Sequence, residues 1–140
     1  MSGRYFLDTN IVIYRFDDRD PHKQEIATDL LWRGLRLRKA VISYQVIQEF
    51  FNTMFRRFPS VFTPEDSEQY LSKVLQRVTT VNSSPELFAQ ALRLHHRYKL
   101  SWYDSLIVAA AIEAKCDVLY TEDLQHGQRF GELVVTNPFL

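Results

Sequence analysis

Four acidic residues stand at positions where α/β proteins place functional groups. Asp8 directly follows the first apolar run of the chain, and Asp123 follows the β-rich run 118–121 by two residues. Glu49 and Asp104 lie in two helical patterns between them. Open α/β sheets bind ligands at the carboxyl ends of their strands, so we expect Asp8 and Asp123 to meet at one edge of a sheet.

Four carboxylates gathered in one crevice would favour a particular chemistry. Two like charges about 4 Å apart repel by about 4 kcal/mol at an effective dielectric constant of about 20. A divalent cation between them removes that cost, and ligation by oxygen alone favours Mg²⁺ or Mn²⁺ over Zn²⁺. Such an ion polarises phosphate groups and lowers the pKa of bound water. The acids therefore indicate metal-assisted hydrolysis of a phosphate ester, and no Cys/His spacing offers a competing metal site.

Each acid also has an ordinary structural explanation. Asp8 and Asp123 are of a residue type that caps helices. Asp104 stands three residues after Ser101, where an acid can complete a capping box. Asp104 also shares a face with apolar residues, and a buried, unpaired carboxylate there would cost roughly several kcal/mol without a partner such as a cation. Glu49 points almost opposite the apolar stripe of its helix, so a solvated glutamate explains it equally well.

The elements that position these acids alternate between short β-rich runs and longer helical patterns. This alternation favours βα units around a mostly parallel sheet of about five strands, in one α/β domain spanning residues 1–140. We expect strands at 5–7, 40–43, 78–81, 118–121 and 133–136. We expect helices after Asp8, from 21 to about 32, from 44 to 58, after 63, from 85 to about 98 and from 102 to 115.

Two of these helical patterns carry much of the predicted core. The pattern from 102 to 115 is apolar nearly all round, which predicts a helix buried inside the domain. The pattern before Pro59 repeats apolar side chains three and four residues apart, which predicts one buried stripe. The stripe comprises Ile47, Phe50, Phe51, Met54, Phe55 and Phe58.

Charge and composition restrict the classes of function. The chain has 46% hydrophobic residues and 14% aromatic residues, which favours a packed globular protein. Lys and Arg number 17, as do Asp and Glu, so nucleic-acid binding must depend on a local basic patch or a bound metal. Such patches are offered by the basic run 33–39 and by Arg56 and Arg57, although solvated surface explains each as well. The single cysteine, Cys116, excludes an intrachain disulfide and is expected to be a buried thiol.

The apolar runs are too short for membrane insertion. No stretch approaches the roughly 20 apolar residues that a membrane span needs. The first eight residues become charged too early for a signal peptide. We therefore expect a cytoplasmic protein that makes no membrane contact.

Four short motifs resemble those of the PIN-domain family, in its order and at its approximate spacing. The chain as a whole is similar to VapC-type toxins, the nuclease half of a toxin–antitoxin pair, over essentially its full length. No single motif is specific, but the ordered set of four is. The motifs are Phe6-Leu7-Asp8-Thr9-Asn10-Ile11, Gln48-Glu49-Phe50, Trp102-Tyr103-Asp104-Ser105-Leu106-Ile107 and Leu119-Tyr120-Thr121-Glu122-Asp123-Leu124.

The resemblance implies an α/β/α sandwich of three layers and an endoribonuclease that uses Mg²⁺ or Mn²⁺ and leaves a 5′-phosphate and a 3′-hydroxyl. Asp8 and Asp104 would hold the metal directly, and Glu49 and Asp123 would bind it through water or hold a second ion. Supporting hydrogen bonds would come from Asn10 and Thr121. Glu122 makes the assignment of the fourth acid slightly ambiguous.

The resemblance also implies partners for the chain. Its substrate would be RNA, with Arg56 and Arg57 as possible contacts. Members of the family are commonly homodimers. They are silenced by a VapB-like antitoxin whose extended tail occupies the groove, often with an arginine among the carboxylates.

Two other classes of small α/β protein also place acids at strand ends, and this chain lacks residues that each of them needs. A phosphoaspartate receiver needs a phosphoacceptor Asp after the third strand, where Asn82 stands, and a Lys near the last, where none follows Lys115. A haloacid-dehalogenase-type phosphatase needs a second Asp where Asn10 stands. The remaining alternative is a catalytically silent PIN scaffold that binds RNA or protein. The presence of all four acids argues against such a degenerate site.

Overall fold

The computed structural model describes residues 1–140 and contains a six-stranded sheet in the order β3-β2-β1-β4-β6-β5. Neighbouring strands are parallel except β5, which pairs antiparallel with β6. The predicted α/β class with a mostly parallel sheet is confirmed, and the two-residue β5 adds a strand that the sequence did not predict. The strands are β1 (Tyr5–Leu7), β2 (Ala40–Ser43), β3 (Thr79–Val81), β4 (Val118–Tyr120), β5 (Arg129–Phe130) and β6 (Leu133–Thr136).

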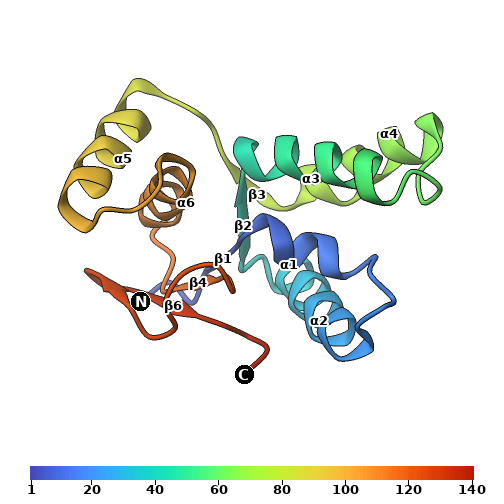
Figure 1. Cartoon of the computed structure of the whole chain (residues 1–140), viewed down its shortest axis with the longest axis horizontal. Coiled ribbons are helices and arrows are strands. Elements are labelled where there is room, and N and C mark those ends of the chain that lie inside the picture. Colours follow the sequence, from blue (N-terminus) through green and yellow to red (C-terminus); the bar gives the residue numbers. More distant parts are fainter.

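Helices cover both faces of this sheet (Figure 1). The helix α2 packs on β2 from one side, and α6, itself paired with α5, packs on β2 and β4 from the other. None of the helices has the length and apolar character needed to cross a membrane. The helices are α1 (Thr9–Tyr14), α2 (Pro21–Leu37), α3 (Tyr44–Arg57), α4 (Pro64–Lys73), α5 (Pro85–Tyr98) and α6 (Trp102–Glu113), with a 3₁₀ turn at Leu75–Arg77.

The helix α2 runs five residues beyond its predicted end at Trp32. The apolar repeat continues to Leu35, and no residue stops the helix until Arg38, which takes a left-handed conformation (φ 56°). The extension brings Gly34 against the sheet. A Cβ on Gly34 would lie 2.4 Å from Cβ of Ala40 and 2.7 Å from Oη of Tyr5, so only glycine allows this approach.

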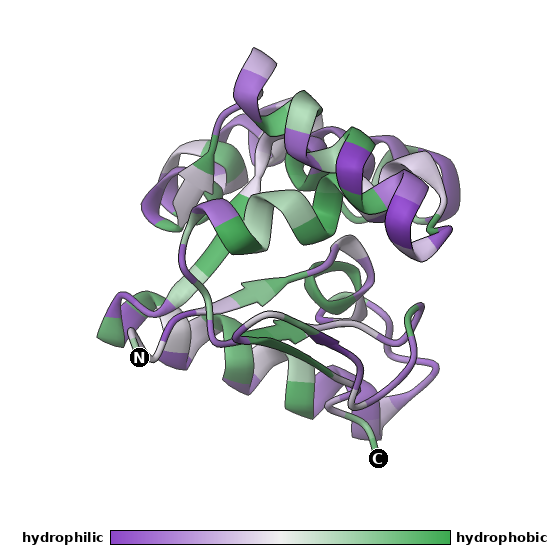
Figure 2. Cartoon of the chain, turned by 90° about the vertical axis from the view of Figure 1, so that its left-hand side faces the viewer, coloured by the Kyte–Doolittle hydropathy of each residue, from purple (hydrophilic) through white to green (hydrophobic).

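Hydrophobic residues concentrate in the strands and in the helices that face them (Figure 2). The helix α6 is buried continuously from Ser105 to Ala111, which confirms the predicted central helix. Cys116 is 5% exposed, and burial raises the pKa of its thiol to about 12. The thiol therefore stays protonated, as expected for a structural cysteine.

The predicted buried stripe on α3 was correct for Phe50 and Met54 but wrong for Phe55, and the buried face is turned toward Val46. The side chains that are buried are Val46, Phe50 and Met54, whereas Phe55 is 53% exposed. Because α3 packs on α1 and β2, its buried face is centred about one position before the apolar pattern. Ile47, Phe51 and Phe58 pack at the margin of the core, partly buried, so they widen the apolar pattern beyond the fully buried face.

Candidate active site

The sheet has a topological switch point at its centre. Chain order runs outward from β1 through β2 to β3 on one side, and through β4 to β6 on the other. Doubly wound sheets bind ligands in the crevice outside the carboxyl ends of the strands at such a point. Asp8 leaves β1 at this edge, where its backbone N–H donates to the carbonyl of Tyr120 at 3.1 Å. Asp123 lies three residues after Tyr120.

Asp8 lies at the centre of this edge and is only 7% exposed. One carboxylate oxygen accepts the backbone N–H of Thr9 at 2.7 Å, and the other accepts the hydroxyl of Thr121 at 2.7 Å. Burial raises the pKa of Asp8 to about 6, against the lowering effect of these two bonds, and the charges of Asp123 and Glu49 raise it further. Asp8 therefore caps α1 and also occupies the acidic region.

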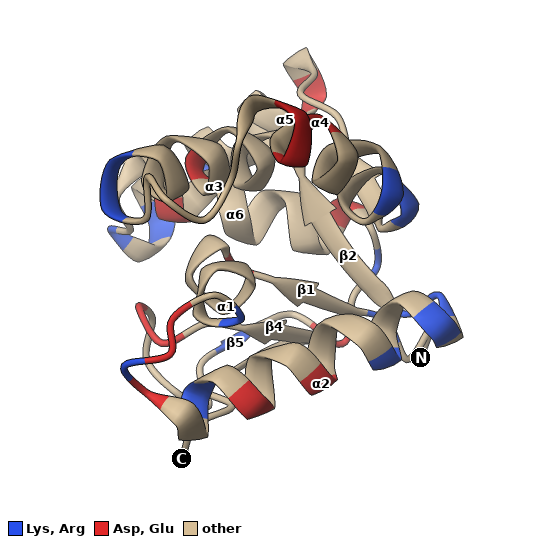
Figure 3. Cartoon of the chain, turned by 90° about the vertical axis from the view of Figure 1, so that its right-hand side faces the viewer, with Lys and Arg blue, Asp and Glu red and all other residues tan.

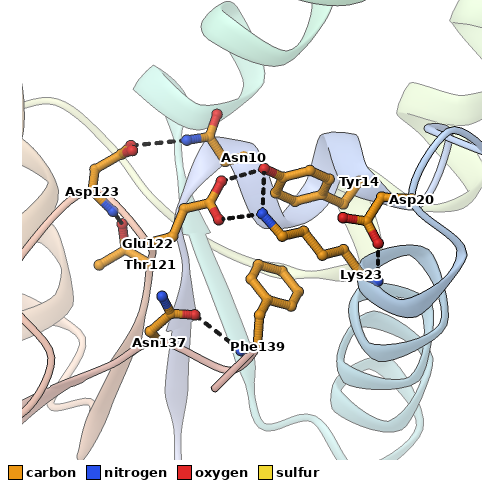
Figure 4. Close-up of polar contacts among 9 residues, drawn as sticks. All are labelled: Asn10, Tyr14, Asp20, Lys23, Thr121, Glu122, Asp123, Asn137 and Phe139. Carbon is orange, nitrogen blue, oxygen red and sulfur yellow. Dashed lines mark hydrogen bonds and ion pairs between the residues drawn. The ribbon is translucent and has the colours of Figure 1, made fainter.

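Asp123 is held by contacts from two elements (Figure 4). The amide of Asn10 donates to its carboxylate at 2.9 Å, and its own N–H donates to the hydroxyl of Thr121 at 3.1 Å. Desolvation by its surroundings raises the pKa of Asp123, and the charges of Asp104 and Glu122 add to the shift. Thr121 thus connects two of the four acids.

Glu49 turns toward the same region from α3. Its carboxylate accepts the hydroxyl of Thr9 at 3.1 Å and the amide of Gln45 at 3.2 Å. The same amide also contacts the carbonyl of Tyr103 at 3.3 Å, which links α3 to the start of α6. Because the buried face of α3 is centred on Val46 and Phe50, Glu49 lies beside that face rather than opposite it, contrary to the prediction.

Asp104 enters from the first turn of α6. Its backbone N–H donates to the Ser101 hydroxyl at 3.1 Å, but its carboxylate gives no return bond, so the capping box is incomplete. The residue is half-buried, whereas the sequence predicted full burial, because the buried stretch of α6 begins one residue later. No protein group donates to its carboxylate, which leaves the oxygens free to bind a ligand.

The four acids lie close enough to influence one another's charge, but they do not surround a metal position on all sides. Asp8 is influenced by Asp123 and Glu49, and Asp123 by Asp104. No three acidic, histidine or cysteine side chains approach closely enough to enclose an ion by themselves. Mg²⁺ is usually bound by one or two carboxylates and several waters rather than by an all-protein cage. An oxygen-only, partly solvated set of this kind fits that requirement.

Glu122 is directed away from these acids (Figure 4). Its carboxylate pairs with the ammonium group of Lys23 at 2.9 Å and accepts the Tyr14 hydroxyl. The Lys23 ammonium lies 5.2 Å from the ring centroid of Phe139 and 4.8 Å from that of Tyr14. Asp123, rather than Glu122, is therefore the acid that turns toward Asn10 and the crevice.

Sequence reasoning missed several residues that position the acids. Gln45 lies four residues before Glu49 on one helix face, a spacing that could have revealed their contact. No local signal links Lys23 to Glu122, because the two are 99 residues apart. His126, close after Asp123 in the chain, accepts the backbone N–H of Asn137 at 3.0 Å.

The chain matches one known protein family. The family model described as PIN domain matches residues 5–129, which is most of the chain and includes all four acids. No curated protein matches the sequence.

Solved structures with a similar fold share little sequence with this chain. VapC20 of Mycobacterium tuberculosis, described as a toxin that cleaves the sarcin–ricin loop, aligns with a TM-score of 0.64 and 18% identity over 85% of this chain and 89% of its own. A toxin–antitoxin complex from Klebsiella pneumoniae aligns with a TM-score of 0.65 and 20% identity, over 96% of this chain and 97% of its own. PAE2754 from Pyrobaculum aerophilum aligns with a TM-score of 0.59 and 21% identity, over 88% of this chain and 76% of its own. At these identities the likeness establishes a shared fold.

Proposed function

The chain belongs to the PIN domain family, and from that premise we propose that it is a Mg²⁺- or Mn²⁺-dependent endoribonuclease, the toxin of a VapBC-like toxin–antitoxin pair. The observation that supports this most is the buried carboxylate of Asp8, whose pKa is raised by burial and by two neighbouring acids. A carboxylate in such surroundings gains most from a cation beside it. The toxin neighbours of the same fold support the biological role.

In the proposed site, Asp8 and Asp104 hold the metal directly. Asp104 is suited to this because its carboxylate has no protein partner, and Asp8 because it is fixed in one orientation by Thr9 and Thr121. Glu49 and Asp123 contribute negative charge at the two sides of the crevice. When bound, the ion polarises the scissile phosphate and makes a water molecule nucleophilic at neutral pH.

The hydrogen-bonding residues around the acids have a positioning role in this proposal. Thr121 holds Asp8 with its hydroxyl proton and receives the backbone N–H of Asp123 on the same oxygen. Asn10 holds the carboxylate of Asp123 from α1. The two residues therefore set the separation of acids that come from opposite ends of the sequence.

The proposal extends to partners and location. RNA would approach past Arg56 and Arg57, which are exposed at the end of α3 and form no ion pair. The protein would work as a homodimer in the cytoplasm, silenced by a VapB-like antitoxin. The toxin–antitoxin complex among the structural neighbours supports the antitoxin partner.

The test is cleavage of a structured RNA pool by the purified full chain with Mg²⁺ or Mn²⁺. We expect Asp8→Asn and Asp104→Asn to reduce the rate by at least about 100-fold, because each removes a group that binds the metal. Asp18→Asn is the matched control, since Asp18 is exposed and makes no hydrogen bond or ion pair. Circular dichroism should show that all variants are folded.

Two results would contradict the proposal. Full activity in either folded site variant would remove the acidic cluster from the mechanism. A wild-type protein that binds RNA but never cleaves the pool would instead indicate the silent scaffold.

A further inference from the structure

A recess lies at the end of the sheet opposite the acids, where β2 and β3 begin. It has a volume of about 810 Å³ and includes Ala40 and Thr79, the first residues of β2 and β3. The acids leave the sheet at the carboxyl ends of the strands, so the two sites are at opposite ends. The volume falls within the range of small-ligand sites, roughly 300–1,000 Å³.

Four cationic side chains line this basic pocket, and no acidic one does. They are Arg36 and Arg38 at the end of α2, Lys73 at the end of α4, and Arg77 in the 3₁₀ turn. Figure 3 shows blue segments at the end of α2 and at the end of α4 on the same side of the molecule. Such a local excess is notable in a chain whose net charge is zero.

None of these four charges is neutralised within the protein. The chain contains ion pairs at Arg19, Lys23 and Arg33 only, so the pocket residues have no carboxylate partner. Their side chains donate no hydrogen bond to another protein group. Within the basic run 33–39, Arg33 pairs with Asp29 at 3.1 Å and the Lys39 ammonium donates to the carbonyl of Ser2 at 2.8 Å. The basic run therefore divides into paired charges and free ones that face the recess.

The composition of the pocket suits an anion with several oxygens, such as phosphate. Three of its four cations are arginines, whose planar guanidinium groups bind phosphate oxygens in a bidentate manner. Trp32 also lines the pocket with 41% of its surface exposed, and the guanidinium of Arg15 lies over its ring, 4.8 Å from the centroid. An aromatic ring beside a row of cations is the combination that single-stranded nucleic acids use for stacking and backbone contact.

We propose that the basic pocket formed by Arg36, Arg38, Lys73 and Arg77 binds consecutive phosphate groups, as in a single-stranded RNA backbone, at a site separate from the acidic cluster. The inference does not depend on ribonuclease activity, because it concerns binding at the other end of the sheet. It assigns a role to α2, α4 and the 3₁₀ turn that the acidic site does not use.

The experiment measures binding of a short fluorescein-labelled single-stranded RNA to the full chain by fluorescence anisotropy, in EDTA so that no cleavage occurs. The test variant is Arg36→Glu with Arg77→Glu. We expect its affinity at low salt to fall about tenfold, since exposed charge contacts are worth a few-fold each. The slope of log K against log salt should fall by about 1.4 for two lost contacts on a single strand.

The matched control is Arg93→Glu with Arg97→Glu, which makes the same charge change on the exposed side of α5. Inorganic tripolyphosphate should compete for the wild-type pocket and lose its effect in the test variant. If binding of tripolyphosphate requires Arg36 and Arg77 but binding of RNA does not, the ligand of the pocket is a free oligophosphate. That result still supports phosphate binding at the pocket.

Three results would overturn the proposal. One is equal affinity of wild type and test variant for both probes. Another is an equal loss of affinity in the control variant, which would show only a general charge effect. The third is competition by polyglutamate as strong as that by tripolyphosphate, which would indicate an acidic polypeptide as the ligand.

Discussion

Asp8 shows how one side chain can have a structural and a chemical role at once. Its carboxylate caps α1 through the Thr9 N–H and is anchored by the Thr121 hydroxyl, yet it is buried beside two other acids. The two hydrogen bonds favour the charged form, and burial opposes it more strongly. The residue is therefore held in place at a cost in stability that a bound cation would relieve.

The free energy of unfolding of the metal-free protein should therefore depend on pH through the ionisation of Asp8. The folded pKa of Asp8, about 6, lies above its ordinary value of 3.8, so the contribution of Asp8 is fully present below about pH 4 and is lost as the pH rises through 6. The loss amounts to about 3 kcal/mol from the size of the shift. Urea unfolding of wild type and Asp8→Asn across this range measures it, because the variant cannot ionise at this position.

The expected result is that the free energy of unfolding of Asp8→Asn rises relative to that of the wild type by about 3 kcal/mol between pH 3 and pH 8. A constant offset between the two proteins reflects only the altered hydrogen bonds and is subtracted. Parallel stability curves over the whole range would show that burial does not raise the pKa of Asp8.

Residue-level prediction from the sequence succeeded unevenly, for physical reasons. Strand-end placement located Asp8 and Asp123, because the carboxyl ends of parallel strands share an edge. The direction of Glu49 was misjudged, because exposed aromatics such as Phe55 shifted the apparent apolar face of α3. The contact of Lys23 with Glu122 required the folded chain, since nothing in either local sequence specifies it.

At the scale of elements, the close approach of α2 to β2 depends on Gly34. The sequence located both elements but ended α2 two residues before Gly34, a residue type that forms helices poorly. Only the packed structure shows that Gly34 faces Ala40 and Tyr5. The unpredicted β5 has a similar cause, since two residues are too few to produce a recognisable alternating pattern.

Gly34→Ala should therefore destabilise the protein even though alanine is the better helix former by about 1 kcal/mol. The added Cβ meets the rigid Cβ of Ala40 at 2.4 Å, and overpacking of this kind costs about 1–3 kcal/mol. We expect a net loss of about 1 kcal/mol and a melting temperature lower by about 3 °C, as measured by thermal denaturation.

A double-mutant cycle with Tyr5→Phe provides the control for this prediction. Removal of the Tyr5 hydroxyl, which a Cβ on Gly34 would approach to 2.7 Å, should make Gly34→Ala less costly than in the wild type. A Gly34→Ala variant as stable as the wild type, with no coupling to Tyr5, would show that the contact between α2 and β2 has room for a Cβ at position 34.

At the scale of the whole molecule, the sheet brings together motifs that lie far apart in the chain. Asp8 and Asp123 are joined through Thr121 at the switch between β1 and β4, and α3 and α6 bring Glu49 and Asp104 to the same crevice. The βα alternation allowed this layered arrangement to be predicted. The basic pocket could not be predicted, because its cations come from α2, α4 and a 3₁₀ turn whose proximity depends on the packed fold.

The most direct test of the central claim is removal and return of the metal in one sample. Wild-type protein that cleaves RNA should stop when EDTA is added and resume when Mg²⁺ or Mn²⁺ is supplied in excess, leaving products with 5′-phosphate ends. Asp8→Asn should stay inactive at every metal concentration. Undiminished cleavage in EDTA, or a wild-type rate in Asp8→Asn after metal is returned, would contradict the assignment of the acidic cluster as a metal-dependent nuclease site.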